Sequence, residues 1–259
     1  MQQLADSPWT PPLPATPCAF STSSASPTIL PPWRPLPCVP ALVKPLPSSL
    51  LVFRRDQDRR VIEWISLTDD SSTTLDDARC EHLRGALTID ADPEGRLYVL
   101  SERLRRLTLL DARGAVQSVL PWTMPGDPIS VHCLDAGSFL IGTWKPGALY
   151  VLDREGRVLW SWTPGRTILA EARAAAMGAD GAYYVADASL HRILAVTPSG
   201  RVVRQVGIAG SPGSGPGRFA NPSMLEVDED GRRPRVRHAK RPRGEARGRR
   251  LGGLGMAGA

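Results

Sequence analysis

Short apolar runs separated by polar turns fill the middle of the chain, from about residue 50 to residue 231. In residues 181–203, for example, YYVA and RILAV flank one polar turn and a TPSG turn follows. No long segment keeps helical spacing. Residues 169–177 contain good helix formers, but the segment is short and we expect loop plus strand there. This pattern is typical of an all-β domain.

The pattern recurs with glycines at fixed positions. Residues 94–114, 137–156 and 181–200 align so that the leading and the closing glycine of each unit are 19 positions apart, and the units step by 42 and then 44 residues. We predict that these glycines close tight turns that need positive φ. They are Gly95, Gly114, Gly137, Gly156, Gly181 and Gly200.

Each unit has room for four strands, the first of which precedes the leading glycine. Four short strands with their turns take roughly 40 residues, which is the length of one propeller blade. A blade cannot bury both of its faces alone, so it must stack on its neighbours. We therefore predict an all-β fold, an incomplete β-propeller of four-stranded antiparallel blades. The predicted units lie near 50–66, 86–120, 129–163 and 172–206, and a further unit starts at 219–231.

One unit resembles the NHL repeat. The resemblance rests on VADASLHRI at 185–193 and on GIAGSPGSGPGRFANPSMLEVDEDG at 207–231. The residues that fit are Asp187, Arg192, Gly217, Phe219, Pro222, Val227, Asp228 and Gly231. The other units match less well: Asp187 aligns with Ser101 and Thr143, and Arg192 with Arg106 and Ala148. The resemblance covers roughly residues 86–231, about three blades, and implies a ring that commonly has six.

The charged pair of the matching unit has two interpretations. An Asp at the end of a strand can accept N–H bonds from the turn it begins, and an Arg five residues later can reach back to it. The other interpretation is a catalytic or ligand carboxylate. A charged pair that belongs to a repeat stabilises the fold of the repeat, so we interpret Asp187 and Arg192 as structural residues. Phe219 and Pro222 are interpreted as packing and turn residues.

The longer connections define a candidate binding face. In an antiparallel blade the Gly-closed turns lie on one face of the ring and the longer connections on the other, and loops on a rigid scaffold carry binding. The candidates on this face are Trp122, Trp144, Lys145, Ser189 and His191. For the two tryptophans, burial under a neighbouring loop and contact with a ligand both remain open.

The resemblance implies a binding or scaffold module for a protein partner or a small ligand, here as a fragment. The alternative is a fragment of a propeller-type lyase or lactonase with an incomplete metal site. We predict no catalytic residue, cofactor or metal site. The four cysteines form no C-x-x-C pair, no H-E-x-x-H motif is present, and the four histidines do not occupy corresponding blade positions.

The N-terminal segment differs in composition from the repeats. Residues 1–49 contain 13 of the 25 prolines, and proline removes backbone donors, so we expect a disordered leader there. No signal peptide and no apolar stretch long enough to span a bilayer is evident, and we expect no membrane partner. The compartment is left open.

The C-terminal segment is basic. Residues 232–250 contain ten Lys/Arg and one Glu, so the net charge of +6 arises there and the rest of the chain carries −3. The charge run begins where a strand is due, and we interpret residues 232–259 as disordered or as a frameshift product. The alternative is a tail that binds nucleic acid.

Overall fold

The computed structural model describes residues 21–23, 40–46, 49–55, 60–69, 71–76, 80–135, 137–227 and 234–238. These residues form β-strands joined by turns and loops, with one 3₁₀ turn, η1 (Glu81–Leu83). Among them no helix has the length and apolar character needed to cross a bilayer. The segment 169–177, expected to be loop plus strand, contains β14 (Ala172–Met177).

Three four-stranded antiparallel sheets follow one another along the chain, each with its strands in sequence order. Blade 2 consists of β6 (Ala86–Ala91), β7 (Leu97–Ser101), β8 (Arg106–Leu110) and β9 (Val116–Pro121). Blade 3 consists of β10 (Asp127–Cys133), β11 (Ser138–Trp144), β12 (Leu149–Asp153) and β13 (Val158–Trp162). Blade 4 consists of β14, β15 (Tyr183–Asp187), β16 (Arg192–Val196) and β17 (Val202–Val206). These are the predicted units 86–120, 129–163 and 172–206.

Blade 1 begins earlier than the sequence analysis expects. Its strands are β2 (Pro40–Pro45), β3 (Ser49–Arg55), β4 (Arg60–Ser66) and β5 (Ser72–Asp76), and β1 (Ser21–Ser23) pairs with β5 as a fifth strand. The expectation of disorder throughout 1–49 is therefore wrong for β1 and β2. The expectation rested on the proline content of the segment. Proline fits in β2 because this strand lies at the edge of its sheet, where a missing N–H costs no ladder bond.

Blade 5 is a two-stranded ribbon of β18 (Pro222–Val227) and β19 (Pro234–His238). The strand β19 lies within 232–259, so the expectation that this whole segment lacks structure is wrong for residues 234–238. The rest of the segment, and with it the frameshift interpretation, lies outside the described residues, as does Gly231. Arginine residues can form part of a β-strand at the edge of a sheet, so the basic composition of this segment does not exclude a strand.

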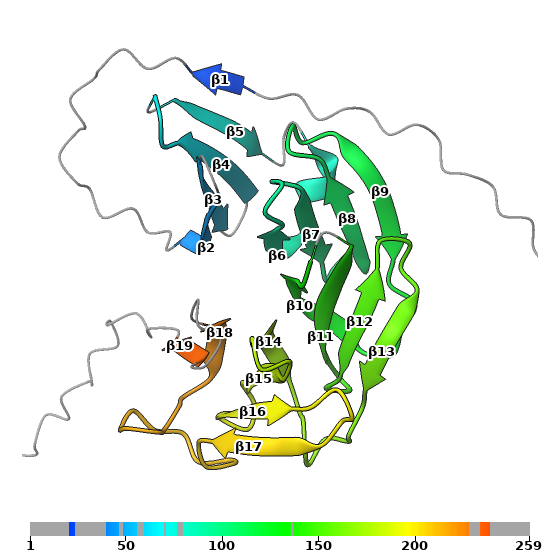
Figure 1. The fold of residues 1–259 in the computed structure, drawn as a ribbon, viewed down its shortest axis with the longest axis vertical. Helices are drawn as coiled ribbons and strands as arrows, with labels where there is room; N and C mark the ends of the chain where they lie inside the picture. Colours follow the sequence, from blue (N-terminus) through cyan, green and yellow to red (C-terminus); the bar gives the residue numbers. More distant parts are fainter. Residues whose placement is uncertain are drawn as a thin grey trace, which may run out of the picture.

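The blades are arranged as an open arc, with the first strand of each blade nearest the centre and the last at the rim (Figure 1). The inner strands are β2, β6, β10, β14 and β18. Each inner strand has a similar irregularity, one bulged residue near its start: it follows the first ladder pair in most of them, as between Ala86 and Thr88, and the second pair in β10, between Pro128 and Ser130. This architecture confirms the predicted incomplete β-propeller.

Apolar side chains fill the spaces between successive blades. The cluster between blades 1 and 2 includes Phe53, Leu75 and Leu83, and the one between blades 2 and 3 includes Tyr98 and Phe139. Further clusters lie between blades 3 and 4 and between blades 4 and 5. Successive blades therefore bury their facing surfaces against each other, as the repeat predicts.

The Gly-closed turns adopt the predicted backbone conformation, with one exception. Positive φ occurs at Gly95, Gly114, Gly156, Gly181 and Gly200. Gly137 does not share it; its N–H instead donates to the Asp135 carboxylate. We call the side of the arc that carries these turns the turn face, and the opposite side, with the β7–β8, β11–β12 and β15–β16 turns and the between-blade connections, the loop face.

Candidate functional site

Three of the five predicted binding residues meet on the loop face, between blades 3 and 4. Trp144 at the end of β11 forms an isolated bridge with Glu171. The Ser189 hydroxyl donates to Oε2 of Glu171 over 2.7 Å. The Lys145 ammonium lies 3.7 Å from the centre of the Trp144 ring. We call these residues, together with Arg173, the Trp144 junction.

The polar groups of the Trp144 junction are only partly satisfied within it. The buried Glu171 carboxylate binds Ser189 and also Nε of Arg173, at 3.0 Å. Lys145 and Arg173 are exposed, and Lys145 has no ion pair with any described residue. The junction thus presents one half-buried indole and two exposed cations. This combination can hold a carboxylate that lies beside an apolar group.

Asp187 fixes the backbone around this junction. Its side chain is buried and accepts N–H bonds from Ala170, Glu171 and Leu190, each at 3.2 Å. Burial raises the pKa of Asp187, although these bonds and the charge of Arg192 oppose the rise. The carboxylate is closed off from solvent, and it serves to position Glu171.

Arg192 extends the same framework. Its Nε lies 3.8 Å from Asp187, and its other nitrogens donate to Gln205 and to the carbonyls of Thr167 and Ile168. The guanidinium therefore ties the β16 strand to the connection between blades 3 and 4. Both residues of the charged pair have the geometry of an architectural element.

Trp122 and His191 lie away from the Trp144 junction. The Trp122 indole is buried, donates to the Gly126 carbonyl at 2.8 Å and packs edge-on against Tyr150. Nδ1 of His191 accepts the N–H of Asn221 at 3.2 Å and so connects blade 4 to the loop before β18. Each of these side chains is engaged in packing or in joining blades.

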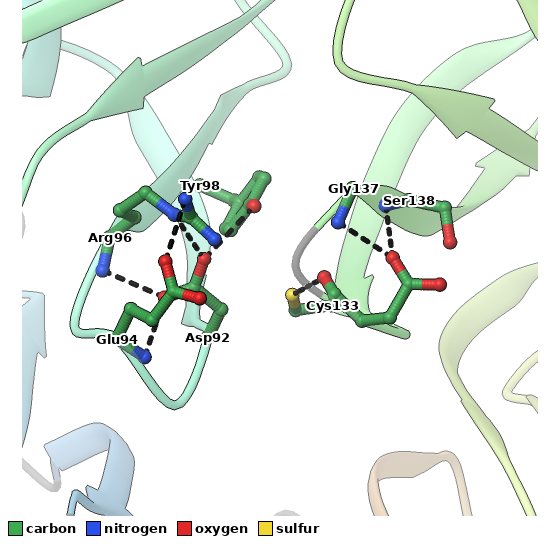
Figure 2. A network of polar contacts seen from close by, with 8 residues as sticks. Asp92, Glu94, Arg96, Tyr98, Cys133, Gly137 and Ser138 are labelled. Atoms are coloured by element: carbon green, nitrogen blue, oxygen red, sulfur yellow. Dashed lines mark hydrogen bonds and ion pairs between the residues drawn. The ribbon is translucent and has the colours of Figure 1, made fainter.

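The turn face contains a second polar network, between blades 2 and 3. Figure 2 shows Asp92, Glu94 and Arg96 at the β6–β7 turn of blade 2, and Gly137 and Ser138 at the equivalent β10–β11 turn of blade 3. Asp92 accepts bonds from the N–H groups of Glu94 and Arg96 and from the Arg96 guanidinium. Such Asp-centred bonds close each turn on itself.

A buried carboxylate joins the inner strands next to this network. Oδ2 of Asp90 lies 3.2 Å from Nδ1 of His132 and accepts the N–H of Cys133 at 2.8 Å. Asp90 is buried, whereas the His132 side chain is 34% exposed. A carboxylate on Nδ1 orients the imidazole and leaves Nε2 free for proton transfer.

Sequence reasoning missed the pair of Asp90 and His132, although the repeat contained the signal. Asp90 pairs with Tyr98 and His132 with Leu140, so both occupy the same position of successive inner strands, 42 residues apart. The search for recurring histidines overlooked them because the two positions carry different residue types. In blade 4 the position is Ala176.

Neither network forms a metal centre. Within the described ranges, no three His, Cys, Asp or Glu side chains gather as a possible metal site. Cys133 is not disulfide-bonded, and its Sγ contacts the Asp135 carbonyl at 3.0 Å, whereas Cys80 is disulfide-bonded. Burial raises the pKa of Tyr98, and the nearby Cys133 raises it further.

Comparison by sequence finds no matching family model and no matching curated protein. The fold is similar to that of several solved structures. A catalytically inactive virginiamycin B lyase from Staphylococcus aureus with quinupristin has a TM-score of 0.55 at 10% identity, and the match covers 82% of this chain and 66% of the lyase. A streptogramin B lyase has a TM-score of 0.53 at 12% identity and matches 82% of this chain and 64% of that one.

A protein of unknown function from Bacteroides caccae is also similar, with a TM-score of 0.51 at 16% identity. That match covers 66% of this chain and 68% of the other. The chain thus spans slightly less than two thirds of the two lyases. At these identities the likeness establishes the propeller-like fold and nothing about activity.

Proposed function

We propose that this chain is an NHL-type propeller that serves as a binding module, with its ligand site at the Trp144 junction. The observation that carries the proposal is that Trp144 and Ser189, from two blades, both contact Glu171, through a β-bridge and through its carboxylate, while Lys145 lies over the Trp144 ring. Loops held by a rigid scaffold are the usual place for binding residues.

The NHL assignment is supported by the unit that carries the repeat residues. Asp187 and Arg192 are buried and bonded to the backbone of the preceding connection. Pro222 is buried at the start of β18, and Phe219 lies in the loop that leads to it. These are the packing and turn roles that the repeat requires.

The ligand that fits the junction has a carboxylate next to an aromatic or aliphatic group. Lys145 and Arg173 supply exposed positive charge, while Glu171 is already bound by Ser189 and Arg173. The Trp144 ring offers a face on which an apolar group can stack. A protein segment with such a side-chain pair, or a small aromatic acid, has this chemistry.

The test uses N-acetylphenylalanine as probe and its amide as the matched uncharged control. In protein labelled with ¹⁵N-tryptophan, the acid should shift the indole signal that disappears in Trp144→Phe, and the amide should bind at least about tenfold more weakly. Lys145→Gln should remove that difference. Shifts of equal size with acid and amide, or shifts only at other indoles, would refute the proposed site.

A lyase-type activity is the second candidate, favoured by the oriented pair of Asp90 and His132. An imidazole held by a buried carboxylate can remove a proton from a substrate, and the similar folds include lyases. Incubation with quinupristin followed by mass spectrometry tests it. Turnover that His132→Gln abolishes would support the activity, and no turnover by the folded protein would count against it for this substrate.

A further inference from the structure

We propose that the loop-face junction of blades 1 and 2 binds a small tetrahedral oxyanion, of the phosphate class, at the Arg106 guanidinium. The residues concerned come from η1 with the turn that follows it, and from the β7–β8 turn with β8. This site lies in a different blade junction from the Trp144 junction, and the argument for it does not depend on the proposed function.

Arg106 and Arg192 occupy equivalent positions of the repeat. Arg106 pairs with Ser101 in the β7–β8 ladder, as Arg192 pairs with Asp187 in the β15–β16 ladder. The preceding connections also correspond, since the fully buried Leu83 and Leu169 lie at the same place in their units. The two arginines thus start from the same scaffold position.

Their partners differ. Arg192 has a carboxylate in Asp187 and donates to Gln205, Thr167 and Ile168. In blade 2 the position of Asp187 is taken by Ser101, whose hydroxyl donates to the Gly85 carbonyl and accepts the N–H of Leu104. Arg106 makes no ion pair and no side-chain hydrogen bond with any described residue. Its charge lacks the counter-charge that blade 4 supplies.

Buried polar atoms without partners occur on both elements of this junction, η1 and β8. Nε of Arg106, Nδ1 of His82 and Oγ1 of Thr108 are buried and make no hydrogen bond within the described part of the chain. The Thr108 side chain is fully buried and lies two residues along β8 from Arg106. Burying a polar group without a partner is costly, so groups of this kind mark a place that a ligand or water completes.

His82 and Arg106 are close enough to affect each other. Burial lowers the pKa of His82, and the positive charge of Arg106 lowers it further. The carboxylate near them is that of Glu81, which is largely exposed and lies 3.8 Å from Nε2 of His82. An anion between the imidazole and the guanidinium would favour the protonated imidazole and oppose this lowering of the pKa.

The rim of the junction is also basic. Arg84 and Arg103 are exposed and have no ion pair with a described residue. They are neighbours in space, because a Cβ placed on Gly85 would lie 3.5 Å from Cβ of Arg103. Tetrahedral oxyanions are bound by such arginine groups through several charge-assisted hydrogen bonds.

The first test measures thermal unfolding in inorganic phosphate and in sodium chloride at equal ionic strength. At saturating phosphate we expect the melting temperature to rise by about 2–4 °C above that in chloride, because the ligand binds only the folded state. In Arg106→Gln this difference should vanish. Arg157→Gln, which changes an arginine on the turn face, is the matched control and should keep it.

Ser101→Asp provides a second and opposite test. It restores the carboxylate that blade 4 has at this position, so the variant should melt above the wild type in chloride and lose its response to phosphate. The proposal is overturned if phosphate and chloride act equally on the wild type. It is also overturned if the phosphate response persists in both Arg106→Gln and Ser101→Asp.

Discussion

The turn face and the loop face are built from the same blades but satisfy their polar groups differently. On the turn face, Asp92, Asp111 and Asp153 each accept N–H bonds from residues two and four positions later. Two arginines there, Arg96 and Arg157, bind the aspartate of their own turn. Each turn is therefore complete within a few residues of sequence.

On the loop face the bonds join residues that are distant in sequence. Arg105 binds Asp127 of the next blade, and Arg192 reaches the carbonyls of Thr167 and Ile168. His191 holds the loop before β18 through Asn221. The loop face thus couples blades, and its connections differ from one junction to the next.

This difference explains where function can arise on a repeat. A turn whose polar groups are hydrogen-bonded within the turn can recur unchanged from blade to blade, so the turns of the turn face are nearly alike. A junction that relies on its neighbour can lose a partner in one blade and keep it in another, as Ser101 and Asp187 illustrate. The Trp144 and Arg106 sites both lie at such junctions on the loop face.

The strongest test of this contrast is Asp187→Ala. Removing the buried carboxylate leaves three N–H groups without their acceptor and Arg192 without its counter-charge, and should lower the free energy of unfolding by about 3–5 kcal/mol. Asp180→Ala, on the turn face, should cost only about 1 kcal/mol. Urea denaturation of both variants measures the difference, and equal losses would contradict the contrast.

Two glycines give the next largest difference. A Cβ on Gly142 would overlap the Ala172 carbonyl oxygen and Oγ of Ser130, so Gly142→Ala should destabilise the fold by about 2–3 kcal/mol. Gly181 has φ of +75° and open space around it, so Gly181→Ala should cost about 1 kcal/mol of backbone strain. If Gly181→Ala proved the more harmful in calorimetry, the packing of adjacent blades would be looser than described.

The ion pair of Arg105 and Asp127 should contribute little although it joins two blades. Both side chains are about two-fifths exposed, so solvent screens the pair, and Arg105→Gln should cost about 0.5 kcal/mol in low salt. The loss should shrink further in high salt. A loss that is large and insensitive to salt in denaturation experiments would show that this pair, too, is structural.

Acid titration should show the smallest effect, on the turn face. The Gly137 N–H lowers the pKa of Asp135 below its ordinary 3.8, so the native state favours the ionised form. Its stabilising contribution is present above pH 3.8 and is lost as the pH falls below that value. Asp135→Asn should therefore lose less stability than the wild type between neutral pH and pH 3, measured by denaturation at each pH.

The blades could be predicted from the sequence because their signals are local. The alternation of apolar runs with Gly-closed turns located blades 2, 3 and 4, and the short segment 169–177 was correctly assigned to loop plus strand. The start of blade 1 at Pro40 could not be found this way. Proline fits in a strand that lies at the edge of a sheet. Amino-acid composition does not indicate which strand will be an edge strand.

The candidate sites were predictable only in part, because their partners come from different elements. The sequence placed Trp144, Lys145 and Ser189 on one face but could not reveal that Glu171 joins them. The repeat places Asp90 and His132 at equivalent positions, but their contact arises where two inner strands meet, which the spacing alone does not reveal. The missing partner of Arg106 became visible only when its blade was compared with blade 4.

The bulge shared by all inner strands has a consequence for the shape of the molecule. Each inner strand carries its extra residue near its start, as at Ile129 in β10, and an extra residue increases local twist. Every blade therefore imposes the same angular offset on the next. The curvature of the arc then arises within each blade and does not require ring closure. An open set of blades can therefore keep the curvature of a closed propeller.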